Sequence, residues 1–431
     1  MSIWSRSGKS MRSMSVLKHK VIVVGGGAAG MMAAGMAAKA GAAVTLFERN
    51  DMLGKKLAIT GKGRCNVTND CSWEDVLKNV PRNARFLFSA MSSYTPSDAM
   101  AFFEHYGCQL KTERGGRVFP VSDKSASVLS ALHKFLQEQK VEIRKGRVEE
   151  LLLKDGVIAG VKTSDGPCYG RCVLICTGGC SYPLTGSTGD GYCLAEQAGH
   201  TIQPVRGSLV PLEEDGDICA SMQGLALKNV SVKLIDKKNK CVFEDFGELL
   251  FTHFGLSGPT ILSASAHMKV GEPYKIAIDL KPALDEQKLD QRILRDFEKY
   301  QNRVIENALQ DLYPKSMIPV MVKRSGIPAD TQANSVTKQQ RRALLELTKR
   351  FTVDIAGLRP VEEAIITSGG VKVKEVDPKT MESKLVPGLY FAGEILDLDA
   401  YTGGFNLQIA WATAVAAGNA AGGRQDFSSE E

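Results

Sequence analysis

The stretch HKVIVVGGGAAGMMAAGMAAKAGAAVTLFER, residues 19–49, decides the fold of this chain. Its apolar, β-branched run VIVV at 21–24 predicts a buried parallel strand, and the alanine-rich segment that follows predicts a helix that ends near Gly41. VTLF at 44–47 predicts a second strand. A strand, a crossover helix and another strand form the repeating unit of an α/β protein with a parallel sheet.

A glycine pattern marks the turn between this first strand and the helix. Three glycines satisfy G-x-G-x-x-G, which permits a tight turn, close approach of a pyrophosphate and close packing of the helix on the strand. Glu48 ends the second strand, where an acid accepts hydrogen bonds from a ribose. This order predicts a dinucleotide site, and a tight turn without a ligand is the alternative. The predicted contacts are Gly25, Gly27, Ala28, Ala29, Gly30, Glu48 and Arg49.

The composition is that of an ordinary globular protein. The chain has 431 residues, enough for two or three domains, with 43% hydrophobic and 24% charged residues. Its 54 Lys and Arg residues exceed its 48 Asp and Glu residues only slightly, and the positive charges are scattered rather than gathered in a stripe. We therefore expect a small-molecule substrate and no nucleic-acid partner.

The cysteines and the apolar segments exclude several other classes. Ten cysteines occur without a C-x-x-C pair or zinc-like spacing, which predicts no metal site and indicates buried thiols in a reducing cytoplasm. No stretch has the length and apolarity of a membrane span, so we expect no membrane partner. Residues 1–17 are expected to form a mobile N-terminal extension. The sequence does not indicate the oligomeric state.

A second stretch with features of a dinucleotide site lies near the C-terminus: GLYFAGEILDLDAYTGGFNLQIAWATAVAAGNAAG, residues 388–422. It predicts a strand, a glycine-containing loop and a long helix of small residues whose free N–H groups and positive dipole end suit the negative charge of a reduced flavin. This favours FAD over NAD as the bound dinucleotide. The predicted contacts are Gly393, Glu394, Gly404, Phe405, Asn406, Leu407 and Gln408.

Another apolar strand, at 173–176, stops at a TGG turn where the backbone would pass close to the cofactor. The predicted contacts here are Thr177, Gly178 and Gly179. Val148, which lies elsewhere in the sequence, is also predicted to contact the cofactor. Two further glycine loops are ambiguous. The loop at 186–190 is either near the cofactor or a helix cap, and that at 367–371 is either a close-approach loop or a plain turn between strands.

Five stretches together resemble the HI0933-like flavoprotein family, which includes BaiN- and YhiN-type proteins and aminoacetone oxidase-like enzymes. They are VIVVGGGAAG, TGKGRCNVTN, TGGCSYPLTGSTGDGY, GELLFTHFGLSGPTIL and GLYFAGEILDLDAYTGGFNLQIAWATA, and they span the chain from about 20 to 422. The resemblance implies non-covalent FAD and a flavin domain of the two-dinucleotide-binding type, built from both ends of the sequence. Strand-rich and helical domains are expected as insertions between these ends.

With this resemblance, the fold class is α/β: a Rossmann-like FAD-binding domain with an inserted antiparallel β domain and a small helical domain. Alternating runs such as VSVKLI and YKIAIDL indicate the strands, and the charged, helical pattern after Pro282 indicates the helices. The expected boundaries are 18–200 with 372–431 for the FAD domain, 201–282 with 350–371 for the β-rich substrate domain, and 283–349 for the helical insert.

The loop TGKGRCNVTND, residues 60–70, packs many hydrogen-bonding groups into a short segment. The resemblance implies that it lies against the flavin and its ribityl chain, whereas the alternative is a surface turn with a structural arginine. Cys65 is interpreted as a small side chain beneath the ring rather than as a thiol relay, because no partner cysteine stands at redox spacing. The predicted contacts are Gly61, Gly63, Arg64, Cys65, Asn66, Thr68 and Asn69.

His253 is the candidate general acid or base. It stands in the Gly- and Pro-containing loop of ELLFTHFGLSGPTIL, and the neutral-range pKa of histidine suits proton transfer that accompanies hydride transfer. The alternative is a loop histidine that only stabilises its own turn.

These features predict a cytoplasmic FAD-dependent oxidoreductase that passes hydride through flavin N5. We expect NAD(P)H-linked reduction of a small unsaturated or keto substrate, with NAD(P)H docking transiently because only one dinucleotide fingerprint is visible. An oxygen-dependent oxidase of small amines is the alternative within the same class. A non-catalytic flavin sensor and an RNA-modifying flavoprotein are the alternatives from other classes.

Overall fold

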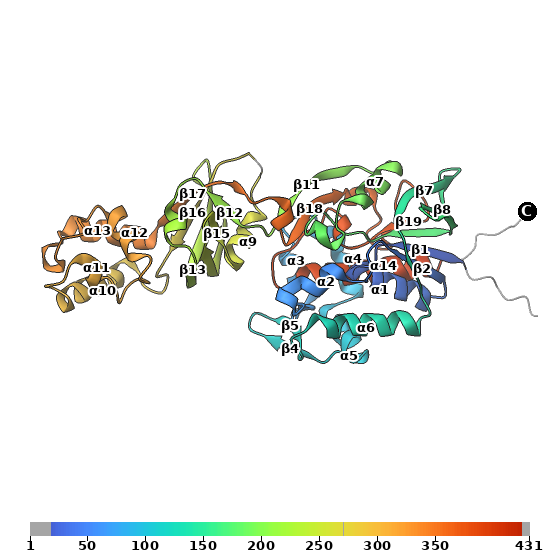
Figure 1. Ribbon diagram of the computed structural model, residues 1–431, viewed down its shortest axis with the longest axis horizontal. Helices are drawn as coiled ribbons and strands as arrows, with labels where there is room; N and C mark the ends of the chain where they lie inside the picture. Colours follow the sequence, from blue (N-terminus) through green and yellow to red (C-terminus); the bar gives the residue numbers. More distant parts are fainter. Residues whose placement is uncertain (1–18, 270, 425–431) are drawn as a thin grey trace, which may run out of the picture.

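A computed structural model of the chain describes residues 19–269 and 271–424 (Figure 1). The extension expected at residues 1–17 lies outside this range. At the centre is a parallel sheet that joins the two ends of the sequence. Its strands, in spatial order, are β19 (Leu389–Phe391), β10 (Cys172–Ile175), β1 (Lys20–Val24), β2 (Ala43–Glu48) and β6 (Glu142–Lys145).

Two helices, α1 (Ala28–Lys39) and α14 (Phe405–Gly422), pack side by side against this sheet (Figure 1). Small residues make their close approach possible. A Cβ at Gly418 would meet the carbonyl oxygen of Ala33 at 2.6 Å, and one at Gly422 would meet that of Ala37 at 2.4 Å. The glycines and alanines of both helices therefore serve packing, and they place the two helix N-termini near each other.

The remaining elements surround this core and complete the body where the FAD domain was expected, called the FAD body below (residues 19–208 and 366–424). A small antiparallel sheet has the order β3 (Thr68–Asn69), β5 (Arg117–Pro120), β4 (Leu110–Glu113), and another the order β7 (Val148–Lys154), β8 (Val157–Thr163), β9 (Gly166–Tyr169). The helices are α2 (Lys55–Ile59), α3 (Trp73–Lys78), α4 (Phe88–Ser93), α5 (Pro96–His105), α6 (Ser125–Glu138) and α7 (Asp190–Gln197).

A closed antiparallel barrel is inserted into this body. Its order is β12 (Leu212–Glu214), β15 (Gly255–Ser257), β14 (Cys241–Phe251), β13 (Ala226–Asp236), β16 (Tyr274–Asp279) and β17 (Phe351–Leu358). The helices α8 (Ile218–Ser221) and α9 (Pro259–Ser265) accompany it. Two further strands, β11 (Ile202–Ser208) and β18 (Ile366–Val371), pair with each other as a separate antiparallel ribbon on the FAD body, next to the barrel (Figure 1).

Beyond the barrel lie the helices α10 (Glu286–Lys299), α11 (Ile305–Ala308), α12 (Ile318–Ser325) and α13 (Lys338–Lys349). They share one hydrophobic core with the barrel, separate from the core of the FAD body. Barrel and helices thus form an arm that extends away from the body (Figure 1). The predicted combination of a Rossmann-like fold with antiparallel and helical insertions is confirmed. Within residues 19–269 and 271–424, no helix meets the length and hydropathy of a membrane span.

Candidate active site

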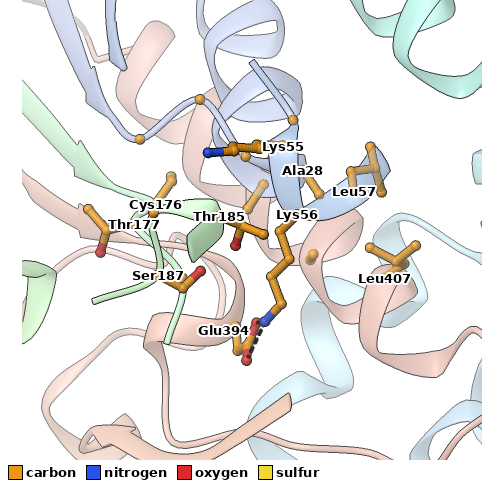
Figure 2. A pocket seen from close by; sticks show the side chains of 18 of the residues that line it. Ala28, Lys55, Lys56, Leu57, Cys176, Thr177, Thr185, Ser187, Glu394 and Leu407 are labelled. Carbon is orange, nitrogen blue, oxygen red and sulfur yellow. Dashed lines mark hydrogen bonds and ion pairs between the residues drawn. The ribbon is translucent and has the colours of Figure 1, made fainter. Parts of the chain in front are cut away.

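A cavity of about 360 Å³ lies where the parallel sheet ends and the helices α1 and α14 begin (Figure 2). The segments that line it come from both ends of the sequence and from the loops between them. The predicted cofactor contacts on its wall are Gly25, Gly27, Ala28, Ala29, Glu48, Arg49, Gly61, Asn66, Val148, Thr177, Gly178, Glu394, Gly404, Asn406 and Leu407. The predicted contacts that stand off the wall are Gly30, Gly63, Arg64, Cys65, Thr68, Asn69, Gly179, Gly393, Phe405 and Gln408.

The N-terminus of α1 opens into this cavity. Gly27 is its N-cap, and no side chain in the described part of the protein caps the helix. Gly25 adopts φ +99°, and a Cβ there would meet the carbonyl oxygen of Cys176 at 2.7 Å. A Cβ at Gly27 would meet no described atom within 4 Å, so space remains beside the free N–H groups for an anionic group.

Glu48 is fixed beside this helix end. Its Oε2 accepts a hydrogen bond from the Gly26 N–H at 2.7 Å, and its Oε1 accepts from the Asn50 backbone N–H at 2.7 Å and the Asn50 amide at 2.8 Å. The carboxylate is almost buried and still borders the cavity. It is therefore held in one orientation, as an acceptor for a ribose hydroxyl must be.

Two arginines extend this end of the site. Arg49 donates to Thr188 at 2.9 Å and to Asp190 at 2.8 Å, and Arg147 donates to Asp190 at 3.0 Å. Both arginines and Asp190 line the cavity. Arg49 was a predicted contact, whereas Arg147 was not, because its position beside the glycine loop at 186–190 depends on the fold.

The N-terminus of α14 forms the other end of the site. Gly404 is its N-cap with φ +100°, and none of the described side chains caps the helix. A Cβ at Gly404 would meet the carbonyl oxygen of Thr68 at 2.3 Å, so the backbone of the loop lies directly against the helix start. Asn406 locks the preceding turn, because it accepts from the Ala400 N–H at 2.8 Å and donates to the Ala400 carbonyl at 2.7 Å.

Several predicted contacts behind this wall support it instead. Gln408 accepts from the Thr68 hydroxyl at 2.8 Å and donates to the Tyr94 carbonyl at 2.9 Å. Asn69 donates to the carbonyl oxygens of Gly115 and Gly403, each at 3.0 Å. These side chains hold the loop at 60–70 against α14, and their polar groups are used within the protein.

The loop at 60–70 reaches the cavity through Gly61 and Asn66. Arg64 points elsewhere: it forms ion pairs with Glu113 and Asp123, and its guanidinium lies 4.1 Å from the ring centroid of Phe119. Cys65 is fully buried with φ +60°, and burial raises the pKa of its thiol to about 12. A thiol with that pKa stays protonated and unreactive at neutral pH.

Lys56 spans the cavity and was not recognised from the sequence. Figure 2 shows its side chain extending to Glu394, with Nζ 2.7 Å from Oε2, and Nζ also donates to the Ser181 hydroxyl at 2.6 Å. Glu394 accepts in addition from the Thr367 N–H at 2.7 Å. This cluster ties α2 to η7 (Gly393–Ile395) and to β18; no motif marks Lys56, because its partners lie far away in the sequence.

His253 lies away from these groups. It is exposed in the turn between β14 and β15, and its ring packs on Phe254 with centroids 5.0 Å apart. The structure does not bring it to the wall of the cavity.

The residues present fit FAD. Asn66 Oδ1 and Thr177 Oγ1 are buried on the cavity wall with no hydrogen-bond partner in the described part of the chain. Buried polar atoms are rarely left unpaired, so these two indicate a polar ligand. The uncapped ends of α1 and α14 offer further donors. A pyrophosphate at one helix end and a flavin ring at the other satisfy this arrangement, which defines a flavin-dependent oxidoreductase.

Comparisons with known proteins agree with this class. A family model described as the HI0933-like protein Rossmann domain matches residues 19–420. A 3-dehydro-bile acid delta(4,6)-reductase from Clostridium scindens is 33% identical over 415 residues, covering 94% of this chain and 100% of the relative. A ribosomal RNA dihydrouridine synthase from Escherichia coli is 31% identical over 399 residues, covering 92% of this chain and 96% of the relative.

Among solved structures, a 3-ketosteroid-delta4-(5alpha)-dehydrogenase from Rhodococcus jostii RHA1 matches 97% of this chain and 99% of its own, with 15% identity and a TM-score of 0.49. The chain belongs to the HI0933-like family, as its motifs predicted. It is an FAD-dependent oxidoreductase.

Proposed function

We propose that this protein is an FAD-dependent reductase that takes hydride from NADH or NADPH and saturates a C=C bond conjugated to a carbonyl group of a small organic substrate. The observation that carries the proposal is the cavity bounded by the open N-termini of α1 and α14. Among the described residues, a single glycine fingerprint is present, so the nicotinamide would dock transiently rather than occupy a second nucleotide domain.

The names of the relatives support the direction of the reaction. One relative is a delta(4,6)-reductase of a bile acid, and the other makes dihydrouridine, which is uridine whose ring C=C bond has been reduced. Both substrates hold the double bond in conjugation with a carbonyl group. The shared chemistry, rather than either substrate, is what we extend to this chain.

FAD supplies hydride transfer at its ring when it is bound. The α1 N–H groups and Glu48 would hold the pyrophosphate and the ribose, while the α14 N-terminus would stabilise negative charge on the ring. Leu209, Ile365 and Ile366 are apolar residues of the cavity wall that would help to keep water away from the reacting atoms.

Anaerobic visible spectroscopy of the purified holoprotein tests this proposal. NADH or NADPH should bleach the flavin band, and an added 3-oxo-4-ene steroid or 2-cyclohexenone should restore it before air is admitted. The proposal fails if small amines bleach the band and nicotinamides do not, because the protein would then be an amine oxidase. A band that no donor bleaches would indicate a non-catalytic flavin protein.

Uridine in ribosomal RNA is a second candidate substrate, favoured by the Escherichia coli relative. The slight excess of positive charge made a nucleic-acid partner unexpected, yet a relative with that name matches nearly the whole chain. Reoxidation of the reduced protein by ribosomal RNA fragments, with dihydrouridine detected by mass spectrometry, would support this candidate. Its rate should then fall steeply with salt concentration, as phosphate contacts require; the steroid and the enone should not show that dependence.

A further inference from the structure

One tyrosine on the cavity wall is not explained by cofactor binding, and it is hydrogen-bonded to a histidine behind the wall. Tyr401 lines the cavity, and its hydroxyl shares a 2.5 Å hydrogen bond with Nε2 of His267. Tyr401 stands in the loop before α14, whereas His267 follows α9 in the arm. The pair therefore joins the FAD body to the barrel at the wall of the site.

The position of Tyr401 is fixed by its backbone. Its N–H donates to the Asn79 carbonyl at 3.0 Å, and the amide of Asn406 holds the neighbouring Ala400 carbonyl at 2.7 Å. Gly404, the uncapped start of α14, follows three residues later. The phenol is thus placed at the α14 end of the cavity, which is the end suited to the reacting ring, and not at the Glu48 end.

The barrel fixes His267 in turn. Its ring lies on Phe243 of β14, with centroids 4.9 Å apart and 33° between the planes, and its other neighbour is the Tyr401 ring at 5.6 Å. Burial and the nearby Arg82 lower the pKa of His267, with Arg206 adding to this and Asp399 opposing it, so the imidazole is neutral at neutral pH.

Tyr401 keeps its proton in these surroundings. Burial, followed by the carboxylates of Asp399 and Asp245, raises the pKa of the phenol above its ordinary value. The neutral phenol of Tyr401 can therefore donate its proton. The neutral imidazole of His267 can then donate a hydrogen bond to the phenolate that forms.

We propose that Tyr401 is the catalytic acid of the reduction and that His267 is its positioning residue. The proposal rests on the proposed function, with NAD(P)H as the reductant. As hydride is added to the β-carbon of the conjugated C=C bond, the O–H bond of Tyr401 breaks and a C–H bond forms at the α-carbon. The phenolate left behind accepts a hydrogen bond from the Nε2–H tautomer of His267 and regains its proton from water.

The test uses holoprotein of Tyr401→Phe, His267→Gln and His267→Leu, with Tyr169→Phe as control, because Tyr169 is 66% exposed on β9. FAD content and reduction by NAD(P)H are measured first. The reduced protein is then mixed anaerobically with 2-cyclohexenone, the 3-oxo-4-ene steroid and uridine, and reoxidation is followed. Binding of cyclohexanone to the oxidised protein, read from the shift of the flavin band, provides a measurement that does not depend on turnover.

We expect Tyr401→Phe to retain FAD, to bind cyclohexanone within about threefold of the parent and to be reduced normally by NAD(P)H. Its reoxidation should slow by about 10²–10⁴-fold, the usual contribution of a general acid. His267→Gln can still donate a hydrogen bond to the phenolate, so its reoxidation should be at least tenfold faster than that of His267→Leu. Tyr169→Phe should be reoxidised at the rate of the parent protein.

Reoxidation of Tyr401→Phe within about threefold of the parent would overturn the assignment. Equal losses of cyclohexanone binding and of rate would also overturn it, because the tyrosine would then only shape the pocket. Failure of the parent protein to be reoxidised by any of the three acceptors would instead refute the proposed function, and the acid role with it.

Discussion

The two ends of the cavity are built in different ways. The frame of the α1 end comes from one continuous segment, the β-α-β unit that contains Gly25, Gly27 and Glu48, and Arg147 and Asp190 join it from elsewhere in the chain. The α14 end is assembled from the loop at 60–70, the η7 segment and the barrel. Local sequence specifies the frame of the first end, whereas long-range packing specifies the whole of the second, so damage to each should have different consequences.

Gly404→Ala should have the largest effect on FAD binding and stability, because it changes the α14 end, which long-range packing holds together. The residue has φ +100°, and the new Cβ would meet the Thr68 carbonyl oxygen at 2.3 Å, so the helix start must move. We expect loss of bound FAD and a fall of more than about 2 kcal/mol in the free energy of unfolding. Flavin content and urea denaturation measure these effects.

Gly41→Ala is the matched control for that variant. Gly41 has φ +112°, but a Cβ there would meet no described atom within 4 Å. The variant therefore has the backbone strain of a left-handed residue without a steric clash between the new Cβ and a neighbour. It should cost about 1–2 kcal/mol and retain FAD. Equal losses in the two variants would show that the contact between Gly404 and the loop at 60–70 is unimportant.

Glu48→Gln should have the next largest effect and should act on the α1 end alone. Removing the charged acceptor of a ribose hydroxyl costs about 1.5–3 kcal/mol, which weakens FAD binding by about 10–150-fold. Binding of FMN, which lacks the adenosine, should not change. Quenching of flavin fluorescence gives both affinities, and Asp51→Asn, an exposed carboxylate nearby, is the control. A parallel loss of FMN binding would contradict the assignment of Glu48.

Gly418→Ala tests the packing that brings the two ends together. Its Cβ would meet the Ala33 carbonyl oxygen at 2.6 Å, so α1 and α14 must separate slightly. Overpacking of this kind costs about 1–3 kcal/mol of stability. Denaturation midpoints measure the cost, and Asn419→Ala, exposed on the same helix, should stay within about 0.5 kcal/mol of the parent. A shift no larger than that of the control would show that the helices are not tightly packed.

Cys65→Ala should have the smallest effect. The pKa of the buried thiol is raised to about 12, so little thiolate forms at neutral pH and no redox relay passes through it. Turnover should remain within about twofold of the parent, and iodoacetamide should modify the exposed Cys193 and Cys241 while sparing Cys65. An inactive Cys65→Ala variant that still holds FAD would restore the thiol relay as the better interpretation.

The sequence was most informative where residues that lie together in the fold are also neighbours along the chain. The glycine fingerprint, Glu48 and the Gly404–Leu407 helix start all carry their own local signature, and the inserted strands and helices show clear periodicity. The partners of Arg64 and of Lys56 could not be predicted, because Glu113, Asp123 and Glu394 meet them only after folding.

The histidines show the same limit. His253 stands in a conspicuous loop but lies in an exposed turn, whereas His267 has no motif and reaches the wall of the site through Tyr401.

The central claim is that one FAD spans both ends of the cavity, and the affinities of the cofactor-free protein for FAD, FMN and ADP test it most directly. The account predicts one equivalent of FAD bound at least 100-fold more tightly than either FMN or ADP, because FMN lacks the adenosine bound at the α1 end and ADP lacks the ring bound at the α14 end. FMN bound as tightly as FAD would contradict it, because the adenosine contacts of the α1 end would then contribute nothing to cofactor binding.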